Sequence, residues 1–126
     1  DQVTGTLKSK LTPLAGKREL GQLHRVIGDL AKRVRSGSSA GGVLFVPSAA
    51  RAICYANRCP SLRASVATCG EAIEQSIEQL AANVLVIEYP HHGPKAIHAM
   101  TERFITADRP SLPLVETQLK ELSSCD

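Results

Sequence analysis

GGVLFVPSAARAICYAN, residues 41–57, is the stretch that decides the fold. Two glycines open a short apolar run that Pro47 closes, which is a pattern typical of a buried strand. The residues that follow have the character of a helix, so the stretch predicts half of a β-α-β unit. Because open α/β sheets bind ligands at the carboxyl ends of their strands, we expect function to gather at the turn Val46–Ser48. We also expect this strand to lie at the centre of the sheet.

Two further apolar runs, residues 62–67 and 83–89, are predicted to be strands. The second, NVLVIEY, is rich in β-branched residues and is ended by Pro90. The predicted helices lie at about residues 3–11, 20–35, 48–57, 94–106 and 111–123, with one more that carries Ile73, Ile77 and Leu80 on one face. Strands that alternate with helices predict an α/β fold with a parallel sheet and right-handed crossovers.

The length, composition and charge of the chain indicate a single globular domain. The chain has 126 residues, of which 43% are hydrophobic, and this suits one domain with a real core. Its formal charge is +3 and its basic residues are spread along the helices, so direct nucleic-acid binding is not expected. No apolar run approaches the roughly 20 residues that span a bilayer, which indicates a soluble protein. The cysteines do not form a secreted disulfide framework, which indicates an intracellular one. Because the sequence opens on Asp1, processing and trimming both stay open, as do a cytoplasmic and an organellar, for example mitochondrial, location.

Polar residues from three predicted turns are expected to meet at the carboxyl edge of the sheet. They are Ser48, Thr68, Cys69, His91 and His92. Ser48 suits the N-cap of a helix better than a donor to a bound anion. Cys69 beside paired histidines is compatible with a nucleophile and its base, or with incomplete metal ligation. We favour a polar loop, because adjacent histidines on an extended segment point to opposite sides.

The cysteines show no Cys-x-x-Cys pair, and their spacing fits neither a zinc ribbon nor a secreted disulfide framework. They are Cys54, Cys59, Cys69 and Cys125. Reduced thiols are therefore the expected state. We predict no metal ion and no cofactor.

The core from Gly42 to Ile105 carries short stretches that match a known family. They are GVLFV, Ala56-Asn57-Arg58, Leu62-Arg63-Ala64, Ala82-Asn83-Val84-Leu85, and Gly93-Pro94 with Ala96-Ile97. On these residues the chain resembles the ribose-5-phosphate isomerase type B and galactose-6-phosphate isomerase family. The resemblance implies a Rossmann-like (flavodoxin-like) three-layer sandwich with a mainly parallel sheet, its N-terminal strands shortened or missing. It also implies a single domain over residues 1–126, and the family's frequent homodimer with sites near the subunit interface.

The catalytic motifs of this family are not matched. Family members typically follow the strand with Cys-Gly-Thr-Gly-x-Gly, whose cysteine moves the proton, whereas this chain has VPSAAR at residues 46–51. Valine cannot titrate, and the added Cβ atoms and the proline disfavour a close backbone approach to a ligand. The family's two histidines fall on Gln79 and Gln2. Only Arg51 and Arg109 are left as counterparts of its phosphate-binding arginines, so we expect no catalytic residue.

We favour a non-catalytic member of this fold that serves as a structural or interaction subunit, in a homodimer or a large complex of other protein subunits. Two features support it. The last helix carries an apolar stripe that needs a partner surface, either this domain or another subunit, and missing strands would leave a sheet edge open to association. The stripe consists of Leu112, Val115, Leu119 and Leu122.

Two other interpretations stay open. In the first, the chain is an aldose-ketose isomerase or a sugar-phosphate binder whose base has moved to Cys69, His91 or His92. Its ligand contacts would come from Ser48, Arg51, Thr68 and Asn83. In the second, Cys54, Cys59 and Cys69 form a thiol or metal regulatory module.

Overall fold

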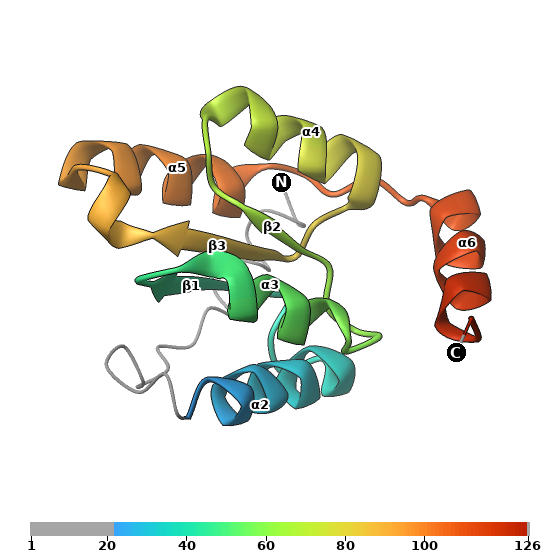
Figure 1. The fold of residues 1–126 in the computed structure, drawn as a ribbon. Helices are drawn as coiled ribbons and strands as arrows, with labels where there is room; N and C mark the ends of the chain where they lie inside the picture. The colour runs from blue at the N-terminus through green and yellow to red at the C-terminus, as the bar shows by residue number, and fades with distance from the viewer. Residues whose placement is uncertain (1–21, 126) are drawn as a thin grey trace.

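The computed structural model describes residues 22–125, and Figure 1 shows their arrangement. The helix predicted at residues 3–11, and Gln2, lie outside the described residues. The elements are α2 (Leu23–Ser36), β1 (Gly42–Val46), α3 (Ala49–Asn57), β2 (Ala64–Val66), α4 (Gly70–Leu80), β3 (Val84–Glu88), the 3-10 turn η2 (Tyr89–His91), α5 (Pro94–Thr106) and α6 (Pro113–Ser123). Strands and helices alternate from β1 to α5 as the sequence predicts.

The described strands form a three-stranded parallel sheet in the order β1-β3-β2 (Figure 1). The predicted α/β class and the parallel sheet are confirmed. The expectation that residues 42–46 hold the central place is wrong for the described sheet, because β3 lies between the other two strands. Residues 84–87 of β3 are fully buried, whereas Phe45 of β1 is 44% exposed.

Helices cover the sheet on both sides (Figure 1), and each side has its own core. On one side α2 and α3 pack on the sheet through Ile27 and Ala52, against Leu44 and Val86 among others. On the other side α4 and α5 pack through Ile73 and Phe104 against Leu85 and Ile87. The side chains of β3 alternate between these two cores, as the pleat of a strand requires. The result is the predicted three-layer sandwich.

β2 is shorter than the predicted strand at residues 62–67 because asparagine side chains bind the backbone where it begins. The Asn83 Oδ1 atom accepts a hydrogen bond from the Arg63 N–H at 2.8 Å. The Asn57 Oδ1 atom accepts one from the Ala64 N–H, also at 2.8 Å. The Arg63 N–H, directly before β2, is thus bound by a side chain where a longer strand would pair it with β3. β2 therefore begins at Ala64.

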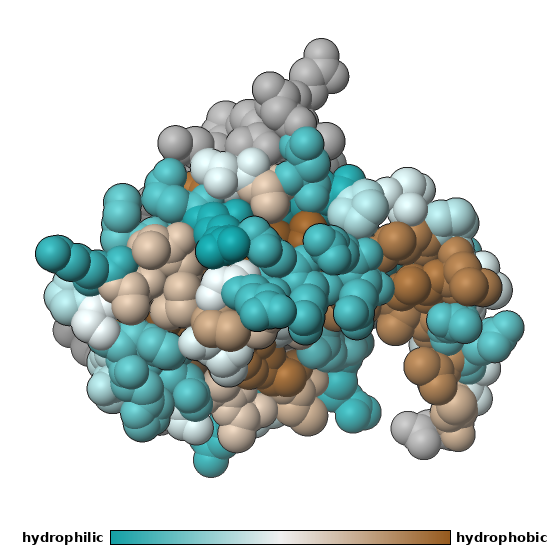
Figure 2. Space-filling model, turned by 90° about the horizontal axis from the view of Figure 1, so that it is seen from above, coloured by the Kyte–Doolittle hydropathy of each residue, from teal (hydrophilic) through white to brown (hydrophobic). Residues whose placement is uncertain are grey.

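α6 lies to one side of the sandwich (Figure 1). In the described part of the chain one ion pair ties it to the body, with 3.8 Å between Arg63 Nη2 and Glu116 Oε1. Leu114 is 69% exposed and Leu122 is 64% exposed. Figure 2 shows apolar side chains gathered over α6, with hydrophilic ones between them. Within residues 22–125 no helix has the length and the apolar character that crossing a membrane requires.

Candidate functional site at the carboxyl ends of the strands

The topology marks one place at the strand ends where a ligand site is expected. β1 is followed by α3 on one side of the sheet, whereas β2 and β3 are followed by α4 and α5 on the other. β1 and β3 are neighbours, so the chain leaves two adjacent strands in opposite directions. Open α/β sheets bind ligands at such a switch point. We refer to residues 46–49 and 88–92, which border it, as the switch-point segment.

Val46 and Glu88 end the two strands and lie opposite each other in the sheet register. Paired residues of neighbouring strands project to the same face, so the Glu88 side chain lies on the α3 side, as Val46 does. Val46 is only 5% exposed and packs in the core under α3. The Glu88 carboxylate reaches the first residue of α3, where Oε2 accepts a hydrogen bond from the Ala49 N–H at 2.8 Å.

Ser48 occupies the predicted N-cap position of α3, with extended backbone dihedrals, but its side chain makes no capping hydrogen bond. The carboxylate of Glu88 caps the helix instead, by accepting the hydrogen bond from the Ala49 N–H. A negative charge at the start of a helix is favoured by the helix dipole and by the N–H groups that lack partners within the helix. Ser48 is therefore the N-cap residue as predicted, but the capping side chain is that of Glu88.

The end of β1 offers no group that could carry a proton. Val46 is apolar and buried, Pro47 has no N–H, and the next side chains are those of Ser48, Ala49 and Ala50. A general base needs a side chain that titrates within reach of the reacting carbon. Residues 46–50 themselves therefore offer only hydrogen bonding, from the Ser48 hydroxyl and the backbone of α3, and the titratable group beside the turn is the Glu88 carboxylate, which accepts a hydrogen bond from the Ala49 N–H.

The other residues proposed for this edge lie apart in several elements. Arg51 is exposed in the first turn of α3, and in the described part of the chain its side chain makes no ion pair. Thr68 is exposed just after β2. His91 is exposed in η2, and His92, which follows it, is half-buried.

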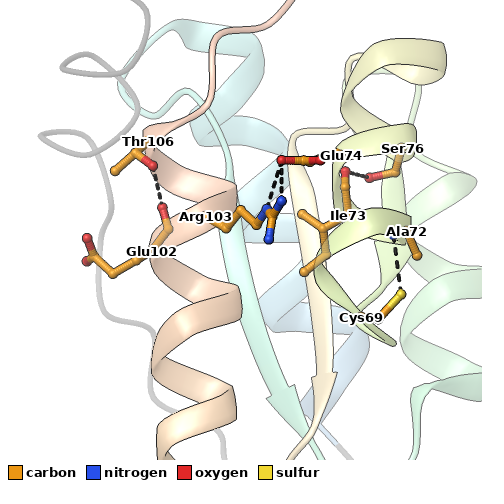
Figure 3. Close-up of polar contacts among 8 residues, drawn as sticks. All are labelled: Cys69, Ala72, Ile73, Glu74, Ser76, Glu102, Arg103 and Thr106. Carbon is orange, nitrogen blue, oxygen red and sulfur yellow. Dashed lines mark hydrogen bonds and ion pairs between the residues drawn. The ribbon is translucent and has the colours of Figure 1, made fainter.

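Cys69 is the N-cap of α4, and its Sγ atom accepts a hydrogen bond from the Ala72 N–H at 3.5 Å (Figure 3). Within residues 22–125 no hydrogen bond joins it to His91 or His92. The four cysteines are free thiols. Residues 22–125 contain no group of three histidine, cysteine or acidic side chains that could hold a metal ion, so Cys54, Cys59 and Cys69 do not form one.

Asn83 lies at the opposite end of the sheet from the switch point, just before β3. Its Oδ1 atom binds the Arg63 N–H, and its Nδ2 atom donates to the Ser61 carbonyl at 2.9 Å. Both ends of the amide are thus engaged with the turn that leads into β2. The position and the contacts of Asn83 indicate a structural brace.

The contacts of Arg109 also indicate a structural role. Its Nε atom donates to the Ala82 carbonyl at 3.1 Å, and Nη1 donates to the carbonyls of Phe104 at 2.5 Å and Ala107 at 2.7 Å. Its guanidinium carbon lies 4.3 Å from the centre of the Phe104 ring, within the range of a cation–π contact. Burial lowers the pKa of Arg109 to about 10, against the opposing effect of Asp108, so the group keeps its charge at neutral pH.

Comparisons with known proteins agree on the architecture. Neither a protein-family model nor a curated protein sequence matches the chain. The structure is similar to type B ribose-5-phosphate isomerase from Trypanosoma brucei, with a TM-score of 0.73 and 15% identity over 98% of this chain and 87% of that one. The Leishmania infantum enzyme has a TM-score of 0.68 and 16% identity, over 80% of this chain and 66% of that one. The Clostridium thermocellum enzyme has a TM-score of 0.68 and 20% identity, over 80% of this chain and 68% of that one. The chain therefore has the fold of the type B ribose-5-phosphate isomerases.

Proposed function

We propose that this chain is a non-catalytic protein built on the isomerase fold, and that it serves as a structural or interaction subunit of a larger assembly. The observation that carries the proposal is Val46, a buried valine at the end of β1. The resemblance in sequence places the proton-carrying cysteine of the isomerases at this residue. With valine there, the reaction lacks its base.

Interconverting an aldose and a ketose requires a proton to move between two adjacent carbons through an enediolate. A side chain has to remove and return that proton, and N–H groups have to stabilise the negative oxygen. Val46 cannot do the first, and the N–H of Ala49 is already bound by the Glu88 carboxylate. Two requirements of the reaction are unmet at the same place.

The interaction role is supported by α6. This helix has 11 residues, and isolated helices of that length are only marginally stable in water. Its leucines at positions 114 and 122 are largely exposed. Burying an apolar helix face against a partner supplies the packing that such a helix needs. We therefore assign α6 to contacts with another protein subunit.

Two measurements test the proposal. Purified protein with ribose 5-phosphate should give ribulose 5-phosphate no faster than buffer does, and turnover well above buffer would overturn the non-catalytic role. In extracts of the native cell, the wild-type protein should elute in an assembly larger than its own monomer. The double variant Leu114→Glu/Leu122→Glu should shift it to the monomer position, whereas Lys120→Glu on the same helix should not. A wild-type monomer in the extract would contradict the interaction role.

The second candidate is an isomerase with a relocated base, and the position of Cys69 favours it. Cys69 is an exposed free thiol at the carboxyl edge of the sheet, and its Sγ atom lies at the start of α4, where it accepts a hydrogen bond from the Ala72 N–H. The turnover assay separates the two functions. Activity that is present in the wild type and lost in Cys69→Ala would establish the relocated site, whereas equal activity in both would exclude Cys69.

A further inference from the structure

We propose that Glu88 acts as an internal ligand, whose carboxylate fills the anion-binding position at the start of α3 and keeps phosphate and other anionic oxygens out of it. This inference deepens the proposed function, on which it rests, because it gives a reason why the switch point would take no sugar phosphate. It concerns occupancy of the site and is separate from the lack of a base at Val46.

The sheet register puts the carboxylate in place. Glu88 is the last residue of β3 and pairs with Val46, the last residue of β1, so both project toward α3. α3 begins three residues after Val46, at Ala49. The bond of 2.8 Å between Glu88 Oε2 and the Ala49 N–H therefore joins two residues that are 39 positions apart in the sequence.

The start of α3 would otherwise be an open anion site. The Ser48 side chain does not cap it, and α3 has no acidic residue in its first turn. Arg51 adds a positive charge to that turn and has no ion pair within the described residues. Free N–H groups at a helix start together with a cation form a site that attracts phosphate and carboxylate.

The start of α3 differs from the other helix starts within residues 22–125: α2 and α5 have neither a side-chain cap nor an acidic residue in the first turn, whereas α4 and α6 have such groups of their own. In α4 the N-cap Cys69 binds the Ala72 N–H, and Glu71 lies in the first turn. In α6 the first turn holds Glu116. Among α3, α4 and α6, only α3 takes its negative charge from another element, and it does so at the switch point where a ligand is expected.

The test is a titration with inorganic phosphate, followed by amide NMR shifts at constant ionic strength. In Glu88→Ala the carboxylate is gone, so the amide signals of Ala49 and Ala50 should move in a saturable way, with an affinity at least about tenfold above the wild type. In Glu88→Gln the amide oxygen can still accept the bond, so the gain should be smaller. Glu71→Ala removes the same charge from the first turn of α4 and should leave the α3 signals unresponsive.

The outcomes separate this inference from the proposed function. A Glu88→Ala protein whose Ala49 signal ignores phosphate, or responds as the wild type does, overturns the internal ligand and leaves the non-catalytic role intact. Equal shifts at every helix start would indicate an adventitious ion only and would overturn it too. Turnover by the wild type would overturn the non-catalytic role alone. If Glu88→Ala does not fold, amide exchange at Ala49 decides, because it should be faster in Glu88→Gln than in the wild type.

Discussion

Replacing Asn83 with alanine should destabilise the protein in the absence of any ligand. The amide of this side chain joins the start of β3 to the turn before β2, through the Arg63 N–H at 2.8 Å and the Ser61 carbonyl at 2.9 Å. Alanine removes both bonds and leaves two backbone groups without these partners. The backbone bonds from the N–H groups of Asn83 and Val84 to the Arg63 carbonyl would stay, so the variant should still fold.

The expected loss follows from the two hydrogen bonds. Each contributes about 1 kcal/mol, and a partly buried group left without a partner costs somewhat more, so the free energy of unfolding should fall by about 2 to 3 kcal/mol. With a slope of about 2 kcal/mol per molar of urea, the unfolding midpoint should fall by roughly 1 to 1.5 M. Urea unfolding followed by circular dichroism measures this directly, and the slope should be unchanged.

Thr68→Ala is the matched control for Asn83→Ala, since Thr68 is exposed and was proposed for the same ligand. It should change stability by less than about 0.5 kcal/mol. If Asn83→Ala shifts the midpoint no more than this control does, the reasoning from its hydrogen bonds is refuted, and a role in ligand binding becomes the better account of Asn83.

Two further substitutions test the packing around the same strand. Gly41→Ala should lower the free energy of unfolding, measured by a thermal melt, by about 2 to 3 kcal/mol, because the added Cβ would collide with the carbonyl of Asn83. Its control is Gly28→Ala, whose Cβ would meet nothing within 4 Å and which should be neutral or slightly stabilising. Arg109→Lys should lower the free energy of unfolding by about 2 kcal/mol, because the ammonium group cannot reproduce the guanidinium hydrogen bonds to three carbonyls. Its control is Arg58→Lys, at an exposed arginine. Identical melts for the two lysine variants would contradict the role assigned to Arg109.

The elements that depend on local pattern could be predicted from the sequence. Residues 84–88 form a strand because β-branched apolar residues follow one another and Pro90 ends the run. α5 begins at Pro94, the favoured place for proline in a helix. Alternation of strands and helices is enough to fix the parallel sheet. These features require no knowledge of contacts between distant residues.

The order of the strands could not be predicted in the same way. The apolar run at residues 42–46, which glycines open, predicts a central strand. The better signal was in β3, where residues 84–87 are apolar at every position and thus suited to burial on both faces. In β1 the pattern of burial alternates and leaves Phe45 exposed. A strand with one poorly covered face belongs nearer to an edge than one covered twice.

Glu88 was missed because its function depends on tertiary register, although the sequence does hold a clue to it. Four buried apolar residues precede a glutamate at the carboxyl end of β3, and a charged residue directly after such a run needs a partner. For the start of α3, the sequence pattern predicts Ser48 as the cap. Because β1 and β3 are neighbours, the Glu88 carboxylate lies on the same face of the sheet as the start of α3. There it accepts a hydrogen bond from the Ala49 N–H. A residue such as Glu88 is therefore found from the strand order, which shows which charged side chain lies at a helix start. Catalytic sequence motifs do not reveal it.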